Sequence, residues 1–200
     1  MKRATFSGIK SILCKILLCL TALMLAAGTA FAEGTSSEDA AGIEISFAYQ
    51  RGTTIASNQL AVWAEDADGT VVKTLLVTDF TAGRRGYRNR TMSLPVWVAA
   101  ADPESMTDEE IDMVSGATPG QGELVYVWDF TNQSGERVPD GIYMVHVEGT
   151  FYWESDVLYT AVIGITNPGN EIPVEMERTA PDIHENENMI TEVYVKVIPY

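Results

Sequence analysis

The chain has 200 residues, of which 13 are basic and 28 acidic, and a formal net charge of −15 at pH 7. This excess of negative charge repels phosphate backbones and argues against nucleic-acid binding. Both cysteines, Cys14 and Cys19, lie near the N-terminus. The rest of the chain therefore holds no disulfide, thiol nucleophile or cysteine metal ligand.

Residues 1–32 have the features of a secretory signal peptide. Basic residues precede an apolar run over residues 16–27, and Ala30-Phe31-Ala32 has the small-x-small pattern that signal peptidase reads. The segment holds four of the basic residues and none of the acidic ones, so a mature chain beginning at Glu33 has 168 residues and a formal charge of −19. We expect this chain to be exported to the periplasm or the extracellular space.

Residues 33–42 are expected to form a flexible segment, and residues 43–200 a single domain. Apolar residues alternate with polar ones from residue 43 to residue 50, and this period of two is typical of a strand with one exposed face. The other predicted strands are residues 58–64, 70–77, 123–130, 141–151, 157–165 and 190–198.

Turn residues join these strands. The Glu65-Asp66-Ala67-Asp68-Gly69 run predicts a β-hairpin between the second and third strands, and residues 131–140 predict a second hairpin with a longer tip. Seven short strands separated by turns favour an all-β fold, an immunoglobulin-like antiparallel β-sandwich.

Two stretches interrupt the strand pattern. An insertion over about residues 78–122 contains a capping box at Thr107, which predicts a short helix over residues 108–114 that ends at a left-handed Gly116. A long acidic loop is expected over residues 167–188. The insertion also carries four of the nine mature basic residues: Arg84, Arg85, Arg88 and Arg90.

Few residues suggest catalysis or metal binding. His146 and His184 have no second histidine or cysteine at ligand spacing, so no metal site is expected. The sequence has no nucleophile elbow and no phosphate-binding glycine loop, and we expect a protein that is not an enzyme and has no catalytic residues.

The segment that follows the predicted helix reads Asp112-x-x-Ser115-Gly116-Ala117-Thr118. It resembles the acceptor motif of proteins that carry covalent flavin mononucleotide (FMN), where an FAD-dependent FMN transferase esterifies the final hydroxyl through the flavin phosphate. The resemblance implies Thr118 as the attachment residue, and Asp112, Ser115, Gly116 and Ala117 as the recognised sequence. The alternative interpretation is a plain helix C-terminus.

A wider resemblance covers nearly the whole mature chain. The chain is similar to a family of predicted periplasmic proteins, domain of unknown function 2271. The resemblance implies export, a β-sandwich, and an association with flavin transferases or membrane redox proteins. It is carried by residues 58–63, 65–69, 72–75 and 94–97, the Ser115-Gly116-Ala117-Thr118-Pro119 segment and residues 127–129. The second predicted hairpin is also similar to the immunoglobulin-like domain of flagellar hook-capping proteins.

Four tryptophans are candidates for the core or for a ligand groove. Trp63 and Trp128 lie on alternating strands and are expected in the core. Trp97 lies in the insertion, where it could cover one end of the sandwich or pack near Thr118.

Two functions remain open. The first is an exported accessory protein that carries covalent FMN and passes electrons between a membrane redox protein and an external acceptor. The second is a cofactor-free binding or assembly module that docks another protein of the cell envelope.

Overall fold

The computed structural model describes residues 40–51, 58–151, 156–165, 172–179 and 189–199. The predicted signal peptide, most of the predicted flexible segment, Trp153 and His184 lie outside these residues. None of the helices within the described ranges has the length and apolar character needed to cross a membrane. The domain begins earlier than expected, because the first strand already includes residues 40–42.

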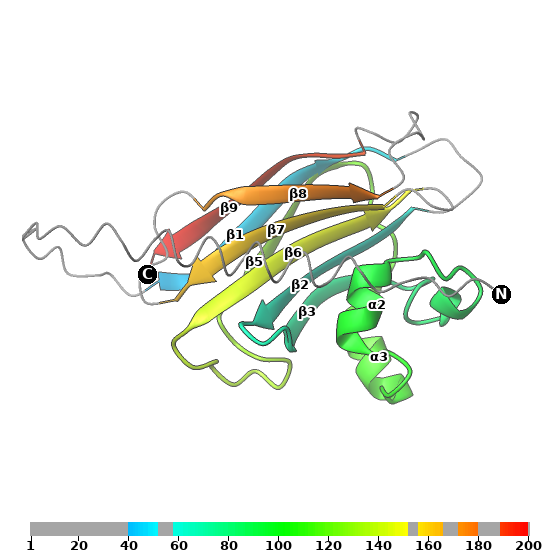
Figure 1. Ribbon diagram of the computed structural model, residues 1–200, viewed down its shortest axis with the longest axis horizontal. Helices are drawn as coiled ribbons and strands as arrows, with labels where there is room; N and C mark the ends of the chain where they lie inside the picture. Colours follow the sequence, from blue (N-terminus) through cyan, green and yellow to red (C-terminus); the bar gives the residue numbers. More distant parts are fainter. Residues whose placement is uncertain (1–39, 52–57, 152–155, 166–171, 180–188, 200) are drawn as a thin grey trace, which may run out of the picture. The chain divides into compact units, whose positions relative to one another are not determined.

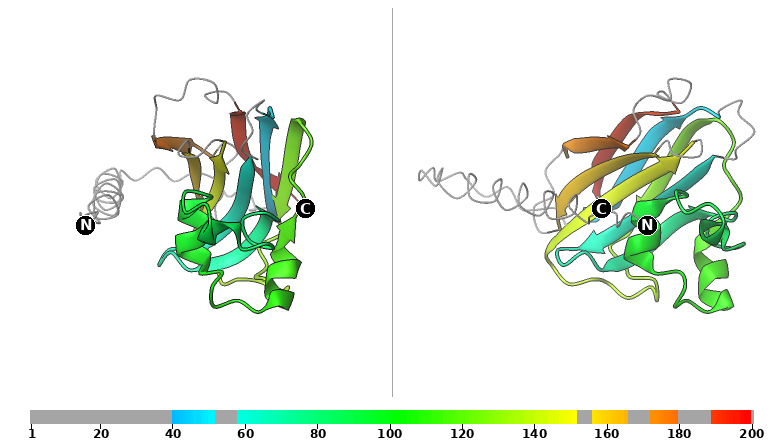
Figure 2. Two further views of the ribbon diagram at one scale, coloured as in Figure 1. Left: turned by 90° about the vertical axis from the view of Figure 1, so that its right-hand side faces the viewer. Right: turned by 45° about the vertical axis from the view of Figure 1, so that its right-hand side comes forward.

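The strands form two sheets that pack face to face (Figure 1). In Figure 2, left, the three-stranded sheet lies on the opposite side of the sandwich from β7 and β8. All strand pairs among the described residues are antiparallel except β3 with β4. The prediction of an all-β sandwich is confirmed. In spatial order, the three-stranded sheet contains β5 (Gly122–Trp128), β1 (Ala40–Tyr49) and β9 (Ile190–Pro199). The six-stranded sheet contains β4 (Ser115–Gly116), β3 (Val71–Thr78), β2 (Gln59–Asp66), β6 (Ile142–Thr150), β7 (Asp156–Gly164) and β8 (Val174–Thr179).

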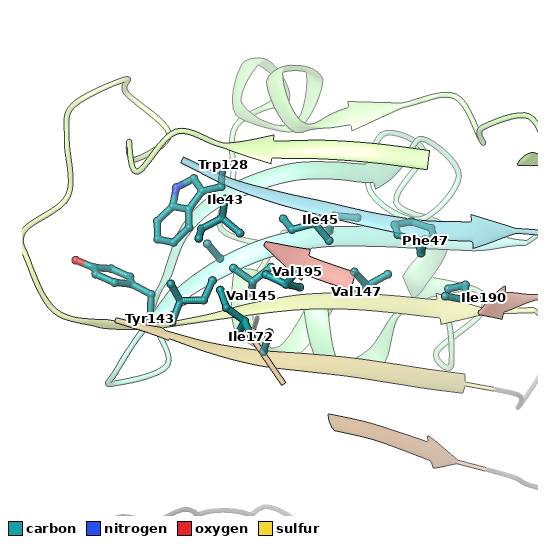
Figure 3. Close-up of a cluster of buried hydrophobic side chains, with 14 of the residues drawn as sticks. Ile43, Ile45, Phe47, Trp128, Tyr143, Val145, Val147, Ile172, Ile190 and Val195 are labelled. Atoms are coloured by element: carbon teal, nitrogen blue, oxygen red, sulfur yellow. The ribbon is translucent and has the colours of Figure 1, made fainter. Parts of the chain in front are cut away.

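Alternating apolar residues fill the space between the sheets. Ile43, Ile45 and Phe47 of β1 are buried and face Val145 and Val147 of β6 (Figure 3). Burying each such side chain contributes about 1.5–3 kcal/mol. The strand pattern therefore predicted the inward faces correctly.

The first predicted hairpin is confirmed. β2 and β3 pair antiparallel, and the Asp66 carboxylate accepts hydrogen bonds from the backbone N–H groups of Asp68 and Thr70. Gly69 has φ of 81°, a left-handed conformation that costs glycine little.

The second predicted hairpin is wrong, because β5 and β6 lie in different sheets. β5 pairs with β1, and β6 pairs with β2 and β7. The connection has hydrogen bonds of its own: Val138 N–H donates to Phe130 O at 2.8 Å and Tyr143 OH donates to Pro139 O at 2.7 Å. Two strands joined by a connection of 13 residues, 129–141, can therefore cross between the sheets.

Two further strands differ from the sequence expectation. The predicted long loop over residues 167–188 contains β8, in which Val174 and Met176 alternate with glutamates beside β7. This strand has only six residues and is flanked by residues typical of turns, so its alternation of apolar and polar residues was not recognised in the sequence. β4 has only two residues, too few for any period to be visible.

The insertion forms a helical cap, defined here as residues 79–114. It contains η1 (Gly86–Arg88), α2 (Pro95–Ala101) and α3 (Asp108–Val114). The predicted helix 108–114 and its capping box are confirmed, since Thr107 Oγ1 accepts from Glu110 N–H and the Glu110 carboxylate accepts from Thr107 N–H. α2 was not predicted.

The expected left-handed end at Gly116 is wrong. Gly116 is not among the residues with positive φ, and the chain leaves α3 in an extended conformation at Ser115. The extended conformation allows Ser115 and Gly116 to pair with β3.

The helical cap covers the outer face of the six-stranded sheet. It forms a second hydrophobic cluster there, in which Trp97 of α2 and Trp63 of β2 are both fully buried. The predicted burial of Trp63 and Trp128 is confirmed, although Trp63 lies under the cap and Trp128 lies between the sheets. Ile111 and Val114 of α3 join the same cluster, so Trp97 packs close to the start of the predicted flavin motif.

Candidate flavin attachment segment

The predicted motif spans the end of the helical cap and the start of the edge strand β4. Asp112 lies in α3, while Ser115 and Gly116 form β4 and pair in parallel with Val77 and Thr78 of β3. One further hydrogen bond, from Asp79 N–H to Gly116 O at 2.7 Å, continues this pairing. The first half of the motif is therefore fixed to the sheet.

The second half of the motif is less constrained. Ala117 is exposed and Thr118 is half-buried, and neither belongs to a helix or strand. Within the described residues, the hydroxyls of Ser115 and Thr118 make no hydrogen bond. A threonine hydroxyl that is partly exposed and makes no internal hydrogen bond fits the role of a flavin acceptor, because no hydrogen bond has to break before it reacts.

Close packing explains the glycine in the motif. A Cβ added at Gly116 would lie 3.3 Å from Leu76 Cδ1, which is tighter than an ordinary van der Waals contact. A larger residue at Gly116 would therefore require the Leu76 side chain to shift by a few tenths of an ångström.

The four arginines of the insertion differ in their surroundings. Arg84 is exposed and forms an ion pair with Asp79, the residue that hydrogen-bonds Gly116. Arg85 pairs with Asp108 at 2.9 Å and Arg88 pairs with Glu104 at 2.7 Å. Arg90 is buried, and burial lowers its pKa.

A buried acidic pair, Glu148 and Asp156, lies beneath the helical cap. The Glu148 carboxylate accepts hydrogen bonds from the backbone N–H groups of Val96 and Trp97, both at 2.8 Å, at the first turn of α2. Thr150 Oγ1 lies 3.0 Å from Asp156 Oδ1 and accepts a hydrogen bond from Leu94 N–H at 2.9 Å. These contacts hold α2 against the sheet.

Sequence reasoning missed this pair, because polar residues that alternate along a strand are expected to face water. Burial is the largest cause of the raised pKa of both groups, and it raises the pKa of Asp156 to about 6. The only available signal was the eight-residue apolar run of residues 94–101 around Trp97, which required a partner on the sheet.

A second polar group under the cap involves His146, which the sequence left without a role. Its ring stacks on Trp63 with centroids 4.8 Å apart, and its Nδ1 lies 3.0 Å from Thr160 Oγ1. Glu65 accepts from Trp63 Nε1 at 2.6 Å. Burial acts to raise the pKa of Glu65, but His146, whose Nε2 lies 3.5 Å from Glu65 Oε2, and the hydrogen bond from Trp63 lower it overall. Among the described residues, no three His, Cys, Asp or Glu side chains are grouped as a metal site.

Comparison with known proteins agrees with the resemblance seen in the sequence. The profile of the family described as predicted periplasmic protein (DUF2271) matches residues 41–178. The chain belongs to this family, and the match includes residues 112–118 of the predicted flavin motif. No curated protein and no solved structure matches the chain.

Proposed function

We propose that this protein is a periplasmic carrier of covalent FMN, attached through a phosphoester to Thr118. The observation that carries the proposal is the position of the Thr118 hydroxyl. It is partly exposed and makes no hydrogen bond within the described chain, at the end of a motif whose first half is fixed to β3. A modifying enzyme requires such an accessible hydroxyl on backbone that can enter its active site.

The attachment reaction balances with FAD as the co-substrate of the transferase. Thr118 Oγ1 attacks the phosphorus of the FMN half, so that an Oγ1–P bond forms and the bond from that phosphorus to the bridging pyrophosphate oxygen breaks. AMP leaves with the electron pair of the broken bond, and the hydroxyl proton passes to a base of the transferase.

The flavin, once attached, supplies the electron-accepting and electron-donating chemistry. The chain's own residues position it: α3 and β3 hold the first part of the motif, and the half-buried Thr118 presents the flavin at the surface. A surface position suits exchange of electrons with another protein, for which a membrane redox protein of the cell envelope is the proposed partner.

The test is the intact mass of the mature protein purified from its native exporting host. We expect the mass of the chain plus one FMN less one water, together with flavin absorbance, and loss of both in Thr118→Ala. The matched control is Thr70→Ala, which removes an exposed threonine from the β2–β3 turn. An unmodified wild-type mass, in cells where another acceptor is modified, would refute the proposal.

The open edge of the three-stranded sheet favours a second candidate function. β5 has no strand on its outer side among the described residues, and its exposed Val125 and Val127 add apolar surface beside that edge. Such an edge can accept a strand from another envelope protein. A cofactor-free docking module would bind its partner equally well as wild type and as Thr118→Ala, whereas Val125→Lys would weaken the binding.

A further inference from the structure

The surroundings of Arg84 distinguish it from the neighbouring arginines. Arg85 donates to Pro103 O at 2.7 Å as well as to Asp108, so it fastens two parts of the helical cap together. Arg88 contacts both carboxylate oxygens of Glu104. Arg84 instead lies at the margin of the cap with 76% of its side chain exposed.

Arg84 is connected to the flavin motif through one residue, Asp79. Its backbone N–H donates to Asp79 O at 2.7 Å and its Nε donates to Asp79 Oδ2 at 2.9 Å. Asp79 N–H in turn donates to Gly116 O at 2.7 Å. Thr118 follows two residues after Gly116, a span of at most about 7 Å.

Most hydrogen-bond donors of the Arg84 guanidinium remain available for a ligand. The Nε–H donates to Asp79, and the two terminal amino groups make no hydrogen bond within the described residues. Arginine can bind two oxygens of one phosphate in parallel, and the ion pair with Asp79 limits the directions in which the side chain can point.

The local charges also favour a cation at this position. A phosphodiester on Thr118 adds a negative charge to a chain with many acidic residues, two positions beyond Gly116, whose carbonyl accepts the Asp79 hydrogen bond. We propose that Arg84 binds the phosphate of the FMN esterified to Thr118, and that Asp79 positions Arg84 for this contact. The proposal rests on the flavin attachment proposed above.

The test uses the loaded protein and the phosphorus NMR resonance of the diester. In wild type we expect the resonance to move as the salt concentration is raised to about 1 M, because the Debye length then falls to about 3 Å and exposed ion pairs are weakened. In Arg84→Gln we expect the resonance to start at the high-salt position of wild type and to lose its salt dependence. The flavin fluorescence anisotropy of this variant should also fall.

Arg88→Gln is the matched control, because it removes the same charge from an exposed arginine of the same loop. It should retain the wild-type resonance and salt dependence, and Arg84→Lys should restore part of the effect. A modified Arg84→Gln protein with the wild-type resonance and anisotropy would overturn the role of Arg84 while leaving flavin attachment intact. Equal changes in both glutamine variants would also overturn it, because the effect would then come from net charge. An unmodified wild-type mass would overturn both proposals.

Discussion

The buried acidic pair makes the protein less stable as the pH rises, and we predict that Asp156→Asn removes this loss. Asp156 is 3% exposed, and Glu148 is completely buried beside it. Two neighbouring carboxyl groups at a buried site cannot both be charged without a large cost, and burial raises the pKa of both groups.

The direction of the effect follows from the pKa of Asp156. Burial is the main reason that this pKa rises from 3.8 to about 6, and hydrogen bonds with Thr150 and Glu148 offset only part of the rise. The folded state therefore keeps a proton that the unfolded chain has released. The contribution of Asp156 to the free energy of unfolding is fully present below its unfolded pKa and is lost as the pH rises through its folded pKa. A rise of about two units corresponds to roughly 3 kcal/mol.

Asparagine imitates the protonated carboxyl group in shape and hydrogen bonding. Its amide N–H can donate to Glu148 and its carbonyl oxygen can accept from Thr150, but it has no proton to lose. Glu148 then keeps its two hydrogen bonds from α2. Asp156→Asn should match wild type near about pH 4 and exceed it by up to roughly 3 kcal/mol at neutral pH.

The assay is urea unfolding of the mature chain, followed by tryptophan fluorescence at several pH values and constant salt. The difference between variant and wild type is the quantity of interest, because carboxylates far from Asp156 contribute equally to both. Asp140→Asn is the control, since it makes the same charge change at an exposed position. A difference that is independent of pH, or an Asp156→Asn protein less stable than wild type at neutral pH, would refute the reasoning.

Two further predictions concern the helical cap. Trp97→Ala should lower the free energy of unfolding by about 3–5 kcal/mol, because it leaves a cavity under the cap and removes the bond from Trp97 Nε1 to Thr74 Oγ1; a loss below about 1 kcal/mol in urea unfolding would mean that the cap adds little stability. Thr107→Ala should cost about 1 kcal/mol by removing the capping box of α3, and unchanged thermal unfolding would contradict this.

Local sequence signals predicted local structure well. The capping box at Thr107 identified the start of α3, and the Asp66 to Gly69 turn identified the β2–β3 hairpin. In both cases the stabilising hydrogen bonds join residues at most four positions apart, so the pattern is contained within a few residues. Alternation along β1 likewise marked its inward face, because a strand has only two faces.

Contacts between distant residues were not predictable in the same way. Alternation in β5 and β6 shows that both are strands, but it carries no information about their partners, and they belong to different sheets. Similarly, the sequence allowed Gly116 to end α3 in a left-handed conformation. In the structure Gly116 is instead part of β4, which pairs with β3. For the site, the motif was visible in the sequence, whereas the link from Arg84 through Asp79 to Gly116 depends on the fold.

The position of the motif limits how far an attached flavin could travel. Ser115 and Gly116 are held in register with β3, so only Ala117 and the backbone of Thr118 separate the attachment point from the sheet. Two residues reach at most about 7 Å, far less than a flexible linker between domains. A flavin on Thr118 would therefore stay beside the helical cap, and electron transfer would require the partner to dock at this end of the sandwich. The stability of the cap, which depends on Trp97 and on the hydrogen bonds of Glu148, would then influence the surface that the partner meets.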